Sequence, residues 1–130
     1  MSAPFAILGI SASGMRTHKV WLDAIADNVA NVSTVRPTDE PAFQERFVEA
    51  QAVEGGGVTV GAVRFGDPNG RLVHDPMNPL ADANGMVRAP DMDLSDQMTH
   101  LIIAQRAYQA NVTTFERVRD AYSRALELGK

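Results

Sequence analysis

Residues 91–128 read DMDLSDQMTHLIIAQRAYQANVTTFERVRDAYSRALEL, and this stretch decides the fold. Its apolar side chains recur at alternating spacings of four and three residues, as on a helix with an apolar stripe. This C-terminal first stripe has only two polar members: Leu94, Met98, Leu101, Gln105, Tyr108, Val112, Phe115, Arg119, Tyr122 and Leu126. A C-terminal second stripe lies beside it: Leu101, Ala104, Tyr108, Asn111, Phe115, Val118, Tyr122 and Ala125. The pattern predicts one long helix.

The ends of this helix carry the expected signals. Pro90 precedes the helix, Asp93 can cap it, and Asp96 follows at the spacing of a capping box. Gly129 is suited to the stop. The sequence therefore predicts a helix from about residue 91 to residue 128.

A second helix is predicted over residues 4–31. Its N-terminal first stripe consists of Phe5, Leu8, Ala12, Met15, Leu22, Ala26 and Val29, with Lys19 in one slot. A neighbouring stripe consists of Ile7, Gly14, Trp21, Ile25 and Val32. Glycine inside a helix costs about 1 kcal/mol relative to alanine. Gly14 therefore indicates either fraying of the helix or close approach of another backbone, and the sequence leaves both open.

Residues 32–90 have the texture of short strands separated by turns. Strands are predicted at 42–53, 58–65, 71–74 and 86–88. Glycine, proline and asparagine separate them, as in Gly55–Gly57 and the Asp67–Gly70 turn. These breakers argue against further helices, so a three- or four-helix bundle is disfavoured.

The predicted fold class is α+β, in which long N- and C-terminal helices pair as an antiparallel coiled coil around a small β-rich insert. The segments are residues 1–34, 35–90 and 91–130. A helix of about 36 residues is roughly 54 Å long, whereas a compact domain of this size has a radius of gyration near 14 Å. Each helix also has more apolar surface than one partner helix covers. We therefore expect a subunit of a larger helical assembly.

The composition excludes several classes of function. With 12 Lys and Arg against 16 Asp and Glu, the net charge of −4 gives no cationic surface for nucleic acid or an anionic membrane. The absence of cysteine excludes disulfides, thiol catalysis and thiolate metal sites. The apolar run at residues 3–10 is far shorter than the ~20 residues of a membrane helix, and the first basic residue is Arg16. We expect a cytosolic protein or one exported without a cleaved signal.

The search for chemistry finds no convincing catalytic, cofactor or metal site. None of the three histidines has a ligand partner three or four residues on: His18, His74 and His100. Residues 80–91 place Asp82, Asn84 and Asp91 where a calcium loop has ligands, but Leu80 stands first and Asp replaces the final Glu. Turn formation explains the same residues. The expectation is therefore no enzyme and no cofactor.

Several motifs resemble the flagellar rod and hook proteins, the axial protein family. They are residues 13–17 (SGMRT), 22–34 (LDAIADNVANVST), 92–98 (MDLSDQM), 104–112 (AQRAYQANV) and 125–130 (ALELGK). Residues 67–82 (DPNGRLVHDPMNPLAD) are similar to a segment of the proximal-rod branch. Together these motifs cover most of the chain.

The resemblance implies a structural subunit that leaves the cell through the flagellar type III export apparatus without a cleaved signal. Such proteins assemble helically with other rod proteins and with copies of themselves in the basal body, and they transmit motor torque across the cell envelope. Alternatives are another rod or hook subunit, a cytosolic coiled-coil adaptor, and an enzyme acting on cell-wall glycan.

We expect the subunit and helix interface to use the stripes. Its predicted members are Leu8, Met15, Leu22, Val29, Asn31, Thr34, Leu94, Met98, Leu101, Tyr108, Asn111, Val112, Phe115 and Tyr122. Asn31 and Thr34 are expected to fasten the end of the first helix. Asn111 and Gln105 are expected to set register, as buried polar residues do in coiled coils.

Overall fold

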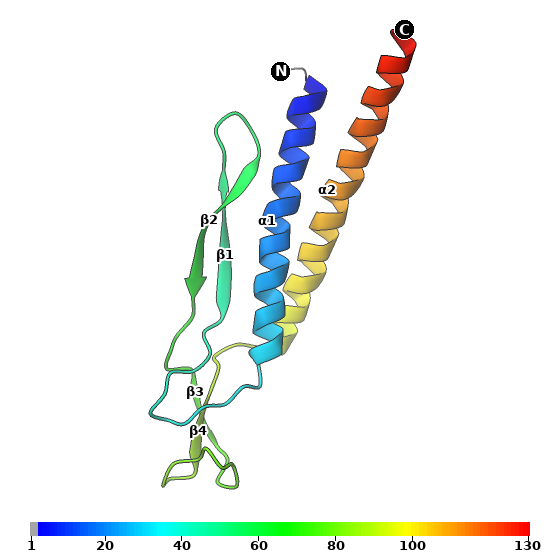
Figure 1. The fold of residues 1–130 in the computed structure, drawn as a ribbon. Coiled ribbons are helices and arrows are strands. Elements are labelled where there is room, and N and C mark those ends of the chain that lie inside the picture. Colours follow the sequence, from blue (N-terminus) through cyan, green and yellow to red (C-terminus); the bar gives the residue numbers. More distant parts are fainter. Residues whose placement is uncertain (1–2) are drawn as a thin grey trace. The chain divides into compact units, whose positions relative to one another are not determined.

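The structure, a computed structural model, describes residues 3–130 and, at Pro4, the backbone only. Its elements follow the order α1 (Ala3–Asn31), β1 (Arg46–Ala52), β2 (Val58–Phe65), β3 (Arg71–His74), β4 (Met86–Ala89) and α2 (Leu94–Leu128) (Figure 1). Strands β1 and β2 form one two-stranded sheet, and β3 and β4 form another. The predicted α+β class, with helices at both ends and short strands between them, is confirmed.

The chain divides into two compact units. The first comprises the chain up to Leu22, Val48–Ala62 and Ile102–Lys130, and the second comprises Asp23–Phe47 and Val63–Leu101. Both helices and the β1–β2 hairpin therefore contribute residues to both units.

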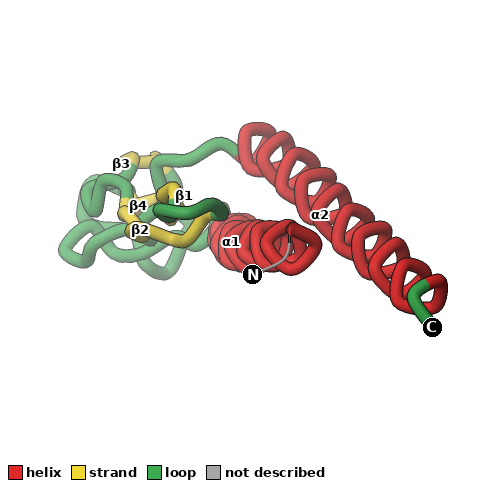
Figure 2. The backbone as a smooth tube through the Cα atoms, turned by 90° about the horizontal axis from the view of Figure 1, so that it is seen from above, coloured by secondary structure: helices red, strands yellow, loops and turns green. Residues whose placement is uncertain are grey.

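In the first unit, α1 contacts the hairpin on one side and α2 on the other (Figure 2). The Val58 amide donates to Ser13 Oγ at 3.0 Å, and Thr17 Oγ1 donates to the Val58 carbonyl at 3.5 Å. The rings of Phe5 and Tyr122 meet edge to face with centroids 4.9 Å apart. These contacts satisfy polar atoms at the strand and bury one face of α1.

In the second unit, β3 and β4 pair antiparallel, from Arg71 opposite Ala89 to His74 opposite Met86. An isolated bridge joins Arg36 to Arg88, with each backbone amide donating to the other residue's carbonyl at 2.8 Å. The segment that leaves α1 is thereby tied to the second sheet.

The observed boundaries differ from the predicted ones where side chains or turns take over hydrogen bonds. Helix α2 begins at Leu94 because Asp93 is its cap: the Ser95 amide and hydroxyl each donate to Asp93 Oδ1 at 2.7 Å. Strand β1 begins at Arg46 rather than residue 42. The amide of Ala42 donates to the carbonyl of Pro68 at 2.8 Å, outside the β1–β2 ladder.

Two carboxylates that accept backbone hydrogen bonds, Asp82 in a turn and Asp93 at the start of α2, predict an acid-sensitive fold. Backbone donation from Met86 lowers the pKa of Asp82 below 3.8, and hydrogen bonds from Ser95 lower the pKa of Asp93 below the same value. A lowered folded pKa stabilises the fold above 3.8, and that stabilisation is lost as the pH falls through the folded pKa. In urea titrations between about pH 5 and about pH 2, Asp82→Ala should lose less stability than the unsubstituted chain. Parallel losses would contradict the assignment.

Candidate functional site

A buried polar cluster connects three elements in the second unit. Asn28 of α1 and Gln97 of α2 are each 1% exposed. Asn28 Nδ2 donates to the Arg46 carbonyl at 3.1 Å and to Gln97 Oε1 at 3.0 Å, while the Arg46 amide donates to Asn28 Oδ1 at 2.9 Å. Asn28 therefore provides partners for the backbone amide and carbonyl of Arg46, the first residue of β1, and for the side-chain amide of Gln97 in α2. We call Asn28, Arg46 and Gln97 the Asn28 clamp.

Charged residues surround the clamp. Gln97 Nε2 donates to Glu45 Oε1 at 2.5 Å, and the Arg46 guanidinium pairs with the Asp27 carboxylate. The Arg46 guanidinium also lies 5.8 Å from the centroid of the Phe43 ring. The side-chain amides of Asn28 and Gln97 each use both their nitrogen and their oxygen in hydrogen bonds within this cluster. The cluster therefore stabilises the packing of α1, β1 and α2 against one another.

The end of α1 is fastened by Asn31 and Thr34. Asn31 Nδ2 donates to the Asp27 carbonyl at 2.8 Å, Thr34 Oγ1 donates to Asn31 Oδ1 at 3.3 Å, and the Thr34 amide donates to the Asn31 carbonyl at 3.0 Å. This geometry closes the last turn of the helix and directs the chain into the following loop.

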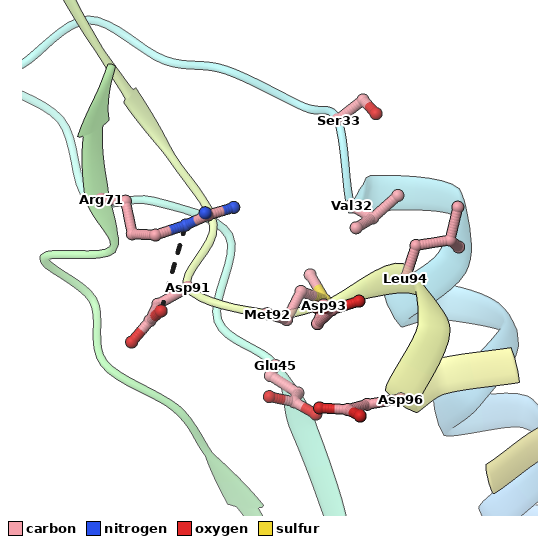
Figure 3. Close-up of a pocket in the computed structure, with 9 residues that line it drawn as sticks. All are labelled: Val32, Ser33, Glu45, Arg71, Asp91, Met92, Asp93, Leu94 and Asp96. Carbon is pink, nitrogen blue, oxygen red and sulfur yellow. Dashed lines mark ion pairs between the residues drawn. The ribbon is translucent and has the colours of Figure 1, made fainter. Parts of the chain in front are cut away.

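An acidic pocket of about 660 Å³ lies at the start of α2 (Figure 3). Its charged lining residues are Glu45, Arg71, Asp91, Asp93 and Asp96. Arg71 Nε lies 4.0 Å from Asp91 Oδ1.

Within residues 3–130, no group of three His, Asp or Glu side chains is arranged to hold a metal ion. The sequence motif considered for calcium forms turns instead, with Asp82 Oδ1 accepting the amides of Asn84 and Met86.

The two helices meet in the first unit at a glycine and an amide. A Cβ on Gly14 would lie 2.8–3.0 Å from the amide atoms of Asn111. Asn111 Nδ2 donates to the Ala107 carbonyl at 3.1 Å and lies 3.4 Å from His18 Nδ1, which is 2.7 Å from the Gly14 carbonyl. Helix α1 continues through Gly14. The helix does not fray at Gly14, and the space of the missing Cβ is taken by the Asn111 side chain of α2 rather than by a backbone.

This contact predicts different outcomes for alanine substitutions at two glycines of α1. Gly9→Ala should raise the free energy of unfolding by about 1 kcal/mol, because alanine is the better helix former and a Cβ there has nothing within 4 Å. Gly14→Ala should lack that gain or be destabilising, because its Cβ displaces the Asn111 amide. Thermal unfolding followed by circular dichroism measures both. In an Asn111→Ala background the two substitutions should behave alike, and a persistent difference would exclude this contact as the cause.

The predicted interface residues fall into two groups by exposure. Leu94 and Met98 are 47% and 43% exposed. The others are half-buried: Leu8, Met15, Leu22, Val29, Asn31, Thr34, Leu101, Tyr108, Asn111, Val112, Phe115 and Tyr122. Among them, Asn31 accepts a hydrogen bond from Thr34, Asn111 lies against Gly14, and Tyr122 packs on Phe5.

On α2, the C-terminal second stripe is the more buried one. Ala104 is fully buried, and the other members up to Tyr122 are half-buried. In the first stripe, Leu94, Met98, Gln105, Arg119 and Leu126 are exposed. The interface prediction did not include Asn28, Gln97 or Ala104, which the structure buries. The signal that could have indicated their burial was the presence of small and polar residues at helical spacing.

Large apolar side chains remain exposed on both helices. They are Phe5, Ile7, Ile10, Val20, Leu94, Met98, Ile102, Ile103, Leu126 and Leu128. Contiguous exposed apolar surface marks a contact with another molecule. Neither helix within residues 3–130 has the length and apolarity needed to cross a bilayer.

A pair of long terminal helices with an apolar face left open is typical of a structural subunit, and comparison with known proteins defines the class. Residues 83–128 match the family model described as the flagellar basal body rod FlgEFG protein C-terminal region. This match covers β4 and α2, and α2 is the element with the strongest helical pattern in the sequence.

Relatives extend the likeness to nearly the whole chain. The flagellar basal-body rod protein FlgC of Salmonella typhimurium is 33% identical over 129 residues, covering 95% of this chain and 96% of the relative. FlgC of Aquifex aeolicus is 32% identical over 131 residues, with 97% of each chain covered. FlgC of Bacillus subtilis is 29% identical over 147 residues, covering 97% and 98%. The chain belongs to the FlgC family of flagellar basal-body rod proteins.

Proposed function

We propose that this chain is a structural subunit of the proximal rod of the bacterial flagellar basal body. The observation that carries the proposal is the likeness to FlgC proteins over 95% or more of both chains. The exposed apolar side chains on both helices give it a physical basis, because a rod subunit must cover such faces with its neighbours. The function is mechanical: packed helices transmit torque from the motor.

The helix pair is proposed to be an antiparallel coiled coil. Phe5 lies against Tyr122 and Gly14 against Asn111, so positions rise along α1 as they fall along α2. The 3-4 spacing of the half-buried second stripe supports knobs-into-holes packing. Leu94 and Met98, which are exposed, are left for neighbouring subunits, while half-buried Leu8, Met15, Leu22 and Val29 are proposed to face α2 or a neighbour.

The proposed partners are other rod proteins, copies of this chain and the flagellar type III export apparatus. The proposed location is the basal body within the cell envelope, reached without a cleaved signal peptide. The role needs no reaction, cofactor or metal, in keeping with relatives that are named as rod proteins.

The test is to purify intact basal bodies from cells that carry an epitope-tagged copy of this chain and to probe the rod fraction. Recovery in that fraction supports the structural role. Recovery only in the cytosol would overturn it and favour a coiled-coil adaptor. Recovery in the hook fraction alone would indicate another axial subunit.

Tyr108→Asp tests the helical interface in living cells. Tyr108 is half-buried on both C-terminal stripes, and a carboxylate placed in a helix contact pays a large desolvation cost. We expect synthesis to persist while rods fail to form and swimming is lost. Gln109→Asp puts the same charge on the neighbouring exposed position and should swim normally. A swimming Tyr108→Asp strain would refute the interface.

A further inference from the structure

The loop between β3 and β4 is ordered by hydrogen bonds between its own residues. The Asp75 amide donates to the Gly85 carbonyl at 2.8 Å, and the Asn78 amide donates to the Asp75 carbonyl at 3.1 Å. Asn78 Oδ1 accepts the Leu80 amide at 3.0 Å. The Gly85 amide donates to the Asp82 carbonyl at 2.9 Å. Residues 75–85, which we call the Met77 loop, are thus held by their own hydrogen bonds.

This ordered loop displays an apolar side chain. Met77 is 90% exposed, and Leu80 in the same loop is 42% exposed. The backbone under Met77 is already ordered by these hydrogen bonds, so the backbone itself loses little conformational entropy on binding. The methionine side chain adapts to irregular apolar cavities. Nothing within the described residues covers it, so the loop has the properties of an anchor for another molecule.

A matching cavity lies in the first unit. The Ala121 pocket, of about 390 Å³, is lined by apolar side chains and one charged residue: Ala3, Ile7, Arg117, Val118, Ala121 and Tyr122. The Met77 loop carries Asp75 and Asp82 and no Lys or Arg. The pocket is apolar with one cation, Arg117, and the loop is apolar with two carboxylates, so the two patches match in apolar character and in charge. The same acidic loop is poorly suited to an anionic membrane surface.

We propose that Met77 of one copy inserts into the Ala121 pocket of a neighbouring copy of this chain. The loop and the pocket are different patches, so the contact is heterologous and each copy offers one of each. Repeated contacts of this kind form rings or open helical arrays. The inference rests on the proposed function, since it names one contact through which the rod subunit meets its own kind.

The absence of cysteine makes a clean cross-linking test possible. Two full-length chains with different tags are co-expressed, one with Met77→Cys and the other with Ala121→Cys, and both positions are exposed. Purified basal bodies are treated with a short bifunctional maleimide. The control pairs Met77→Cys with Gln109→Cys, an exposed α2 position about 18 Å along the helix from Ala121.

The expected result is a heterodimer carrying both tags for the 77–121 pair, at a yield several-fold above that of the 77–109 pair. Arg117→Glu in the Ala121→Cys chain should lower this yield several-fold. Both chains present in basal bodies without a heterodimer would overturn this contact and leave the rod assignment standing. Cross-linking of Met77→Cys to a different protein, or to lipid, would also overturn it. Absence of both chains from basal bodies would overturn the proposed function and the contact together.

Discussion

Asn28→Ala is expected to unfold the second unit under conditions where the unsubstituted chain is stable. The substitution removes three hydrogen bonds at a site that is 1% exposed, and it takes the Asn28 partner away from the Arg46 amide, the Arg46 carbonyl and Gln97 Oε1. Each buried polar group left unsatisfied costs about 1–3 kcal/mol. The combined loss, on the order of 3–5 kcal/mol, is a large share of the 5–15 kcal/mol typical of a domain. Urea unfolding followed by circular dichroism measures it.

Two variants distinguish the loss of the Asn28 clamp from the effect of replacing any asparagine. Asn69 is exposed, and its hydrogen bonds with Asp67 and Arg88 use its backbone amide and carbonyl. Asn69→Ala should therefore change the free energy of unfolding by less than about 0.5 kcal/mol. Asn28→Asp keeps the acceptor for the Arg46 amide but removes both donated bonds. It should be nearly as damaging as Asn28→Ala. An Asn28→Asp chain of normal stability would show that the donated bonds to Arg46 and Gln97 contribute little.

Gly70→Ala is the second substitution with a large expected effect. Gly70 has φ +55, and a Cβ there would lie 2.1 Å from the Ala89 carbonyl oxygen and 2.6 Å from Ala42 Cβ. The Ala89 oxygen is a backbone atom opposite Arg71 in the β3–β4 ladder, so it cannot rotate away. We expect a loss of at least about 4 kcal/mol, the range reached by few point substitutions.

Gly55→Ala is the matched control for Gly70→Ala. Gly55 also has a positive φ, +86, but a Cβ there has no atom within 4 Å. Its cost should be limited to the left-handed backbone, about 1–2 kcal/mol. Thermal unfolding of both variants isolates the steric overlap as the difference between them. Equal losses would mean that the turn beside β3 yields easily and that the contact with Ala89 is soft.

The local elements were predictable to different degrees. The bounds of β2 and β3 agree with the pattern at both ends, because glycine and proline turns delimit each strand. The pattern also predicted Asp93 as the cap of α2. The start of β1 was wrong by four residues. Residues 42–45 have strand-like composition, but Ala42 bonds Pro68, which lies far along the chain.

The candidate site depends on longer-range contacts. Nothing near Asn28 in sequence distinguishes it from exposed polar residues of the same helix, since its partners lie 18 and 69 positions away. Gly14 was equally open to fraying or close approach until Asn111, from the other end of the chain, occupied the space of its missing Cβ. Spacing identified which positions share a face but not which face is covered.

The sequence by itself determined the long terminal helices, the turn-rich middle and the family likeness, because helical periodicity, capping and turn chemistry act over a few residues. The tertiary structure decided the rest. Burial of the second rather than the first stripe of α2, the Asn28 clamp and the exposure of Met77 all depend on which distant segments meet. Side-chain burial is a property of the packed chain, and a local pattern carries no information about the partner that supplies it.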